Sequence, residues 1–269
     1  MTAQLLRIPS DDYHARDGFS SSLAKLLIER SPAHAKAEYR KPATKEMDRG
    51  SVVHRLVLGA GKDFEVLHFD SFRTNAAKDA RDKARAAGKV PILEEAFAEA
   101  NVIAESVRVQ LLERGITLDG ESEIAIEWHE DSAHGPVLCR CMLDHLWLGD
   151  GRILDLKITG NAAPNAVERN AESMGYAIQE AAYRRALVAL EPGLAGRVDF
   201  LFAFAEAEQP YAMNIARGDG MFREIGERRW LRAVETWARC MAEDNWPAYG
   251  AGVNPLSPPP WALAKEEYV

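Results

Sequence analysis

Three segments in the middle of the chain, residues 122–130, 137–148 and 152–158, show the apolar alternation or apolar runs of β-strands. The last two join at Asp150-Gly151, and Asp-Gly between two apolar runs is the strongest short-range signal of a β-hairpin with a two-residue turn. This hairpin constrains the fold more than any other feature, because it sets the direction of two strands and the register between them.

Helical patterns flank these strands on both sides. They cover residues 23–29, a short helix that starts at Ser31-Pro32, and then about 45–58, 76–87, 92–114, 171–190 and 221–242. Two more strands, 198–205 and 211–216, predict a second hairpin around Gln209-Pro210. The order predicts a mixed α/β domain with a central sheet of about five strands flanked by helices, and it disfavours a Rossmann or barrel fold.

We expect one domain over residues 1–269, since the interior has no long Gly/Ser linker and no repeat. Its parts are a helical N-terminal region at about 20–115, a candidate catalytic core at about 120–245 and a Pro-rich tail at about 250–269. No stretch approaches the roughly 20 apolar residues of a membrane helix. Residues 1–10 lack the pattern of a secretion signal, so a cytoplasmic location is expected.

The three cysteines, Cys139, Cys141 and Cys240, are too few for a four-cysteine metal site within one chain. Cys139 and Cys141 lie two apart on a predicted strand, which favours buried thiols over a disulfide.

The net charge of −8 at first argues against a nucleic-acid partner. Basic residues nevertheless gather in two clusters, which are Lys36, Arg40, Lys41, Lys45, Arg49, Arg55 and Lys62, and then Lys78, Arg81, Lys83, Arg85 and Lys89. Each cluster is either a solvated helix face or part of a local track for DNA phosphates.

A two-residue turn at Asp150-Gly151 would place Leu146 opposite Asp155, and Asp144 opposite Lys157. Asp144, Asp155 and Lys157 would then project from one face of the hairpin, with the two aspartate Cβ atoms about 6–8 Å apart. A three-residue turn would move Asp144 to the other face unless a bulge restored the register.

Two carboxylates gathered on a sheet are costly to desolvate unless a cation compensates them. Oxygen ligands suit Mg²⁺ or Mn²⁺, which can activate water and stabilise the transition state of phosphodiester hydrolysis. A lysine beside them can neutralise the developing charge. The alternative interpretation is an exposed ion-pair cluster on an edge strand.

Leu143-Asp144 followed by Asp155-Leu156-Lys157 resembles the PD-(D/E)xK nuclease motif. The fuller pattern resembles the RecE-type exonuclease branch, which includes the nuclease domain of exonuclease VIII. The matching pieces are Ser20 to Leu23, Ser31 to His34, Gly50 to His54, Cys139-Arg140, Asp155 to Lys157, and Tyr176 through Gln179 to Tyr183.

This resemblance implies that His54 joins Asp144 and Asp155 around Mg²⁺, with Mn²⁺ able to substitute and the Leu156 carbonyl as a further ligand. It also implies that the remaining matched side chains support the site or contact DNA, namely Gln179, Tyr183, Tyr176 and Arg140, while Glu123 matches a catalytic acid of the family. The chain departs from the pattern at Ile158, where threonine is usual, and at Leu143 before the first aspartate. Neither departure removes a ligand, so we expect an active enzyme.

The resemblance implies an exodeoxyribonuclease that degrades one strand of linear double-stranded DNA from the 5′ end and leaves overhangs for phage-type recombination. A strand-annealing protein as partner and a homo-oligomeric ring would fit this function. Two alternatives stay open, a RecB-like single-strand or flap nuclease and a catalytically silent nuclease fold that serves as a DNA-binding or assembly module. The chain lacks Gly-x-Ser-x-Gly, a phosphate loop and His-Glu-x-x-His, so other hydrolase classes have little support.

Overall fold

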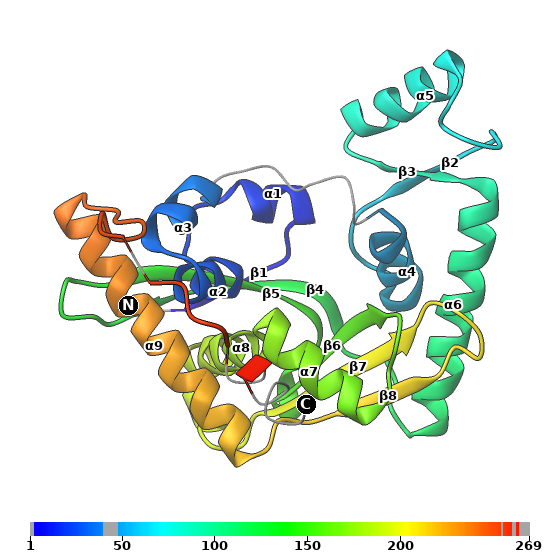
Figure 1. Cartoon of the computed structure of the whole chain (residues 1–269). Coiled ribbons are helices and arrows are strands. Elements are labelled where there is room, and N and C mark those ends of the chain that lie inside the picture. The colour runs from blue at the N-terminus through cyan, green and yellow to red at the C-terminus, as the bar shows by residue number, and fades with distance from the viewer. Residues whose placement is uncertain (1–2, 40–47, 254, 260–261, 264–269) are drawn as a thin grey trace.

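The computed structural model describes residues 3–39, 48–253, 255–259 and 262–263, without the side chains of residues 48 and 49. A six-stranded sheet in the order β1-β4-β5-β6-β7-β8 runs through the centre of the molecule (Figure 1). Its strands are β1 Gln4–Leu6, β4 Glu121–Glu130, β5 Val137–Trp147, β6 Arg152–Thr159, β7 Asp199–Glu206 and β8 Met213–Ala216. The pair β6–β7 is parallel and the other pairs are antiparallel, which confirms the predicted mixed α/β class.

Apolar residues on the two faces of this sheet pack against different helices, because successive residues of a strand point to opposite sides. Ile153 and Phe202 belong to the core that includes residues of α2 (Ser21–Glu29), α8 (Tyr176–Leu190) and α9 (Gly220–Glu243). Leu154 and Ala203 belong to the core that includes residues of α4 (Asp48–Leu58) and α6 (Glu94–Glu113).

The body also contains the helices α1 (Ser10–Ala15), α3 (Pro32–Glu38) and α7 (Pro164–Met174). The side chains of Ser20 and Ser31 accept hydrogen bonds from the backbone nitrogens of Leu23 and His34, so both serines cap the helices that follow them. The predicted start of the next helix near Lys45 lies outside the described residues.

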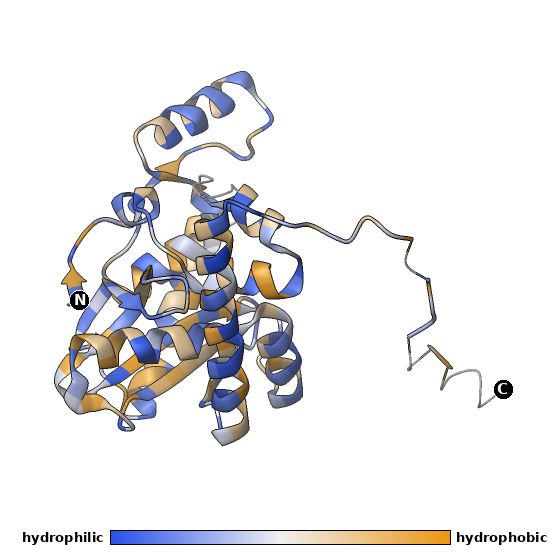
Figure 2. Cartoon of the chain, turned by 90° about the vertical axis from the view of Figure 1, so that its left-hand side faces the viewer, coloured by the Kyte–Doolittle hydropathy of each residue, from blue (hydrophilic) through white to orange (hydrophobic). Residues whose placement is uncertain are grey.

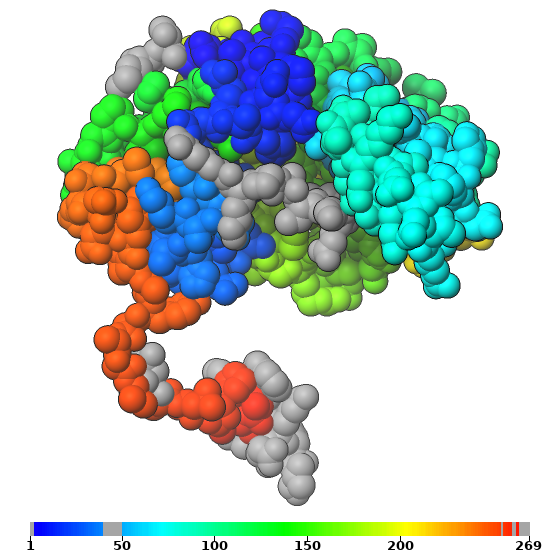
Figure 3. Space-filling view, turned by 90° about the horizontal axis from the view of Figure 1, so that it is seen from above, coloured from blue at the N-terminus to red at the C-terminus, as the bar shows by residue number. Residues whose placement is uncertain are grey.

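A second, two-stranded sheet stands apart from the main one. The parallel strands β2 (Phe64–Leu67) and β3 (Val90–Leu93) are joined by α5 (Asn75–Ala86), and this β2–α5–β3 arm protrudes from the body (Figures 1 and 3). The helix predicted to begin at residue 92 begins at Glu94 instead, after β3. Residues 90–93 extend because they pair with a strand far back in the sequence, and the backbone nitrogen of Val90 donates to the Asp63 carbonyl at 2.8 Å.

The predicted helix 171–190 is also two helices in the structure. Gly175 adopts a left-handed conformation with φ +70°, which ends α7 and begins α8. Pro164 lies in the first turn of α7, where a missing N–H costs nothing, so that helix starts before the predicted boundary.

The hairpin between β5 and β6 has a longer turn than predicted. Trp147 pairs with Arg152, and residues Leu148–Asp150 form a 3₁₀ turn closed by Gly151 at φ +66°. The two-residue turn was wrong because a type I′ turn needs positive φ at both central residues, and here Gly151 has it while Asp150 does not. The register shifts by two residues, and an even shift leaves every side chain on its predicted face.

All three cysteines are buried free thiols, as predicted for Cys139 and Cys141. No helix in the described part of the chain is long and apolar enough to cross a membrane. Residues 250–253 and 255–259 are exposed and extend away from the body (Figure 2).

Candidate metal centre

The candidate site lies where β5 and β6 separate. The two strands pair only from His145↔Leu154 to Trp147↔Arg152, and beyond this point β5 stays on β4 while β6 stays on β7. Asp144 directly precedes His145 in β5, and it is therefore the first residue of this strand that no longer pairs with β6. Its Oδ2 accepts a hydrogen bond from the backbone nitrogen of Leu156 at 2.7 Å, so the carboxylate occupies the gap that the missing ladder bond leaves.

Three side chains from three elements converge at this fork. His54 of α4, Glu123 of β4 and Asp144 of β5 each offer a ligand atom, and these atoms all lie within 4.8 Å of one another. His54 Nδ1 is 3.6 Å from Asp144 Oδ2, and the imidazole also hydrogen-bonds the backbone of Leu156. The structure thus brings His54, Asp144 and the Leu156 backbone together and adds Glu123 to them.

Asp155 lies beside this group and is engaged by a second set of residues. Its Oδ1 is 2.5 Å from Lys157 Nζ, and Gln179 Nε2 of α8 donates to its Oδ2 at 2.5 Å. The Lys157 ammonium also lies 4.8 Å from the centre of the Tyr176 ring. Asp155 is almost fully buried, and Oδ1 has the ionic contact with Lys157 but no hydrogen bond of good geometry.

Burial and crowding shift the protonation equilibria of these groups. Burial, assisted by Asp144, raises the pKa of Glu123 to about 7. Burial likewise raises the pKa of Asp155 to about 6 against the opposing effect of Lys157, and it raises the pKa of Asp144. Burial and the nearby Lys157 lower the pKa of His54 to about 4, so the imidazole is neutral at pH 7 and its nitrogen lone pair is available.

Lys157 remains a cation, because the two aspartates raise its pKa by more than burial lowers it. Burial raises the pKa of Glu123, Asp144 and Asp155, so a further cation at the fork would stabilise the ionised forms of these carboxyl groups. A neutral imidazole with several carboxylates is a donor set that suits a hard divalent cation such as Mg²⁺ or Mn²⁺. The residues present fit the metal that the sequence predicted.

The two remaining candidates, Tyr183 and Arg140, are not members of the group at the fork. Tyr183 packs at the edge of the core with its ring 6.0 Å from that of Phe200, and burial first, then Asp155, raises the pKa of its phenol. Arg140 instead anchors the N-terminal segment. Its guanidinium donates to the carbonyl of Tyr13 at 2.7 Å and lies 4.5 Å from the centre of the Tyr13 ring.

Two polar residues beside the site were not predicted. His145 is completely buried, and its Nδ1 lies 2.7 Å from the hydroxyl of Ser122. A lone histidine in an apolar strand is an ordinary core residue, so only its position next to Asp144 could have drawn attention to it.

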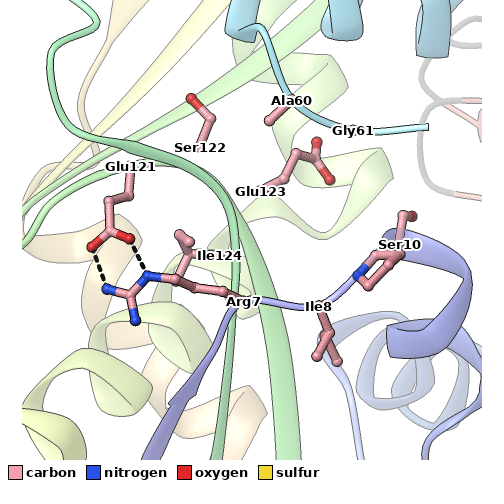
Figure 4. A pocket seen from close by; sticks show the side chains of 10 residues that line it. Arg7, Ile8, Ser10, Ala60, Gly61, Glu121, Ser122, Glu123 and Ile124 are labelled. Atoms are coloured by element: carbon pink, nitrogen blue, oxygen red, sulfur yellow. Dashed lines mark hydrogen bonds and ion pairs between the residues drawn. The ribbon is translucent and has the colours of Figure 1, made fainter. Parts of the chain in front are cut away.

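A pocket of about 450 Å³ opens beside Glu123 (Figure 4). It is lined by the N-terminal segment from Arg7 to Ser10, by Ala60 and Gly61 in the loop after α4, and by the first residues of β4. Arg7 pairs with Glu121 across it at 2.5 Å. Of the three side chains that converge at the fork, Glu123 lines this pocket.

The basic clusters occupy different parts of the surface. In the first cluster, Arg40, Lys41, Lys45 and the side chain of Arg49 lie outside the described residues, while Lys62 pairs with Asp11 at 2.8 Å. The second cluster lies on the β2–α5–β3 arm, where Lys78 and Lys83 are exposed.

Residues 20–255 match the sequence model of a family described as PDDEXK-like domain of unknown function (DUF3799). A crystal structure named "putative exonuclease", from Eubacterium rectale, superposes with a TM-score of 0.56 at 13% identity, covering 94% of this chain and 97% of that chain. A phage-related exonuclease from Haemophilus somnus covers 87% of this chain and 100% of its own, at 11% identity and a TM-score of 0.36. A search of curated proteins finds no match. At these identities, the first superposition establishes the fold alone.

Proposed function

The chain belongs to the PDDEXK-like domain family of unknown function (DUF3799), and from that membership we propose that it is a divalent-metal-dependent exodeoxyribonuclease of the RecE type. One observation carries the proposal. Two motif carboxylates, Asp144 and Asp155, with Lys157, lie at a strand fork that also gathers His54 and Glu123. The name of the Eubacterium rectale protein supports exonuclease action, and the sequence pattern supports the branch.

His54, Glu123 and Asp144 would hold the cation, with Asp155 and the Leu156 carbonyl as the further ligands that the family resemblance implies. A divalent cation in such a site supplies positive charge to the phosphodiester and lowers the pKa of bound water. Lys157, a cation at neutral pH, stabilises negative charge that develops on the phosphate oxygens. Gln179 fixes the orientation of Asp155 through its hydrogen bond, and Tyr176 packs against the lysine from the same helix.

We propose linear double-stranded DNA as the substrate, degraded from the 5′ end to leave single-stranded overhangs for recombination. The exposed lysines of the arm supply local positive charge to an otherwise acidic chain. A homo-oligomeric ring and a strand-annealing partner belong to the same proposal.

The decisive experiment digests linear duplexes labelled at the 5′ or the 3′ end, with Mg²⁺ and then with EDTA. Early loss of the 5′ label as mononucleotide, only with the metal, is the expected result. If the protein cuts linear single strands and flap substrates faster than the duplex, the RecB-like alternative is favoured. Intact substrates of all three kinds, with DNA still bound, would favour the silent module.

A further inference from the structure

The first residues of β4 are tied to β5 by a pair of side chains. The Ser122 hydroxyl lies 2.7 Å from His145 Nδ1, and the backbone nitrogen of Gly120 lies 3.1 Å from His145 Nε2. Both ring nitrogens of this fully buried histidine are therefore engaged by the segment that leads to Glu123.

The two contacts define which nitrogen carries the proton. A backbone N–H can only donate, so Nε2 of the neutral ring accepts from Gly120 and Nδ1 bears the hydrogen. Nδ1–H then donates to the Ser122 oxygen. The ring thus bridges the N–H donor of Gly120, just before β4, and the hydroxyl acceptor of Ser122 in β4.

The surroundings hold this bridge tightly. A Cβ at position 120 would lie 2.3 Å from the Leu146 carbonyl oxygen and 3.0 Å from His145 Nε2, so the close approach requires glycine. The Trp147 ring lies 4.4 Å from the His145 ring, and the indole nitrogen donates to Asp119 at 2.8 Å. Strand β5 therefore fixes the entry of β4 at several consecutive residues.

The residue after Ser122 needs such support. Glu123 has φ +54°, a left-handed conformation that is strained for a residue with a side chain. It lies between the ladder pairs Ser122↔His145 and Ile124↔Leu143, and Asp144 lies between them on β5. Such a conformation persists only where the surrounding structure determines it.

We propose that Ser122 and His145 are positioning residues, which hold β4 so that the Glu123 carboxylate lies within the metal-binding group. Ser122 acts through Glu123, because it adjoins that residue and its own hydroxyl is bound to His145 rather than offered to the group. This inference rests on the proposed function, and it assigns two supporting residues that the family pattern does not include.

The test measures Mn²⁺ affinity by calorimetry on the full chain, in a double-mutant cycle of Ser122→Ala with Glu123→Gln. Ser122→Ala should weaken Mn²⁺ binding about tenfold, as loss of a support for a metal ligand does. Ser122→Thr, which keeps the hydroxyl, should restore affinity. In the Glu123→Gln background, Ser122→Ala should change affinity less than about twofold, since coupled residues are not additive.

Ser132→Ala is the matched control, because that hydroxyl also bonds a neighbouring group, the Gly135 carbonyl, but in the turn at the far end of β4. Thermal unfolding verifies that each variant is folded at the assay temperature. A tenfold loss that persists in the Glu123→Gln background, or no loss in a folded Ser122→Ala chain, would overturn the inference.

The results also separate the inference from the proposed function. A chain that shows the expected cycle but digests no DNA contradicts the function and supports the inference. If the chain digests DNA, and the Ser122→Ala variant binds Mn²⁺ as tightly as the unmodified chain, the function is supported and the inference is contradicted. Absence of Mn²⁺ binding by the unmodified chain overturns both.

Discussion

Asp155 contacts both the cation Lys157 and the amide of Gln179, so the proposed nuclease reaction should depend strongly on this residue. We predict that Asp155→Asn lowers the nuclease rate by at least about 100-fold, the scale for losing one electrostatic group at a reaction centre. The fold should survive, because the amide keeps the size of the side chain and Asp144 still provides negative charge near Lys157.

Rates on linear duplex at saturating Mg²⁺, together with the melting temperature, test this prediction. Asp150→Asn is the matched control, since Asp150 is exposed in the turn of the same hairpin. Equal rates for the unmodified and Asp155→Asn chains would leave the silent module as the better interpretation.

Gln179 gives a second prediction for a single residue. Two substitutions separate the loss of its side-chain amide from the introduction of a negative charge. Gln179→Ala should lower the rate by about 10- to 100-fold, because Asp155 loses the donor that orients it. Gln179→Glu should be worse, since a carboxylate there repels Asp155 and raises its pKa further. The control is Gln110→Ala, whose amide bonds the Tyr211 carbonyl away from the fork. A Gln179→Glu variant as active as Gln179→Ala would contradict this account.

At the scale of elements, the sequence predicted the half-buried strands well and the turn between them poorly. Strand β5 alternates because one face, with Cys139, Cys141 and Leu143, packs in the core that includes residues of α8 and α9 while the residues between them are partly exposed, so its period is visible in the sequence. The faces of Asp144, Asp155 and Lys157 were preserved only because the wrong turn shifted the register by an even number.

Elements that depend on distant partners were missed. Strand β1 has three residues and exists because Leu5 pairs with Ile126, and β2 and β3 exist because they pair with each other around α5. The left-handed backbone of Glu123 and the approach of His54 to Asp144 are likewise tertiary effects. The local sequence pattern does not reveal these contacts, so this part of the site could be predicted only from the three-dimensional structure or from the family resemblance.

Glu130 at the end of β4 joins that strand to α8 and α9. Its carboxylate is 2.5 Å from an Arg185 nitrogen and accepts hydrogen bonds from the indoles of Trp128 and Trp230 at 2.8 and 3.2 Å. Burial alone would raise the pKa of Glu130, but the donors outweigh burial and the pKa lies below its ordinary value of 4.5.

This depressed pKa predicts how stability changes with pH. The folded state holds Glu130 ionised more strongly than the unfolded state does, so its contribution is complete above pH 4.5 and is lost as the pH falls through the folded pKa. Glu130→Gln should cost about 2 kcal/mol at pH 7, below the usual cost of breaking a buried pair because Arg185 is partly exposed.

Urea unfolding at pH 7 and at pH 3.5 measures the difference in the free energy of unfolding between the unmodified chain and Glu130→Gln. This difference should be smaller at pH 3.5. Glu172→Gln, which breaks the pair of Glu172 with Arg229 on the surface of α7 and α9, should have a small effect at both values. A Glu130→Gln penalty that is the same at pH 3.5 as at pH 7 would contradict the assignment of an ionised carboxylate.

At the scale of the whole molecule, the question is how a chain of net charge −8 holds a polyanion. The arm with α5 stands at one side of the body and helix α9 at the other (Figure 1). If the arm contacts DNA, the double change Lys78→Glu and Lys83→Glu should weaken duplex binding and reduce the salt dependence by about 0.9 per lost phosphate contact. Affinity is measured with the Asp155→Asn chain at several salt concentrations, so that the duplex stays intact.

The matched control makes the same change of net charge on α9, with Arg228→Glu and Arg232→Glu at exposed positions. If the arm contacts DNA directly, only the arm variant should show a large loss of duplex affinity and a weaker dependence of that affinity on salt. The Mn²⁺ affinity should be unchanged in both variants. Equal losses would mean that net charge governs binding and that the arm has no direct contact with phosphates. The comparison therefore distinguishes a built DNA track from the general repulsion between an acidic protein and DNA.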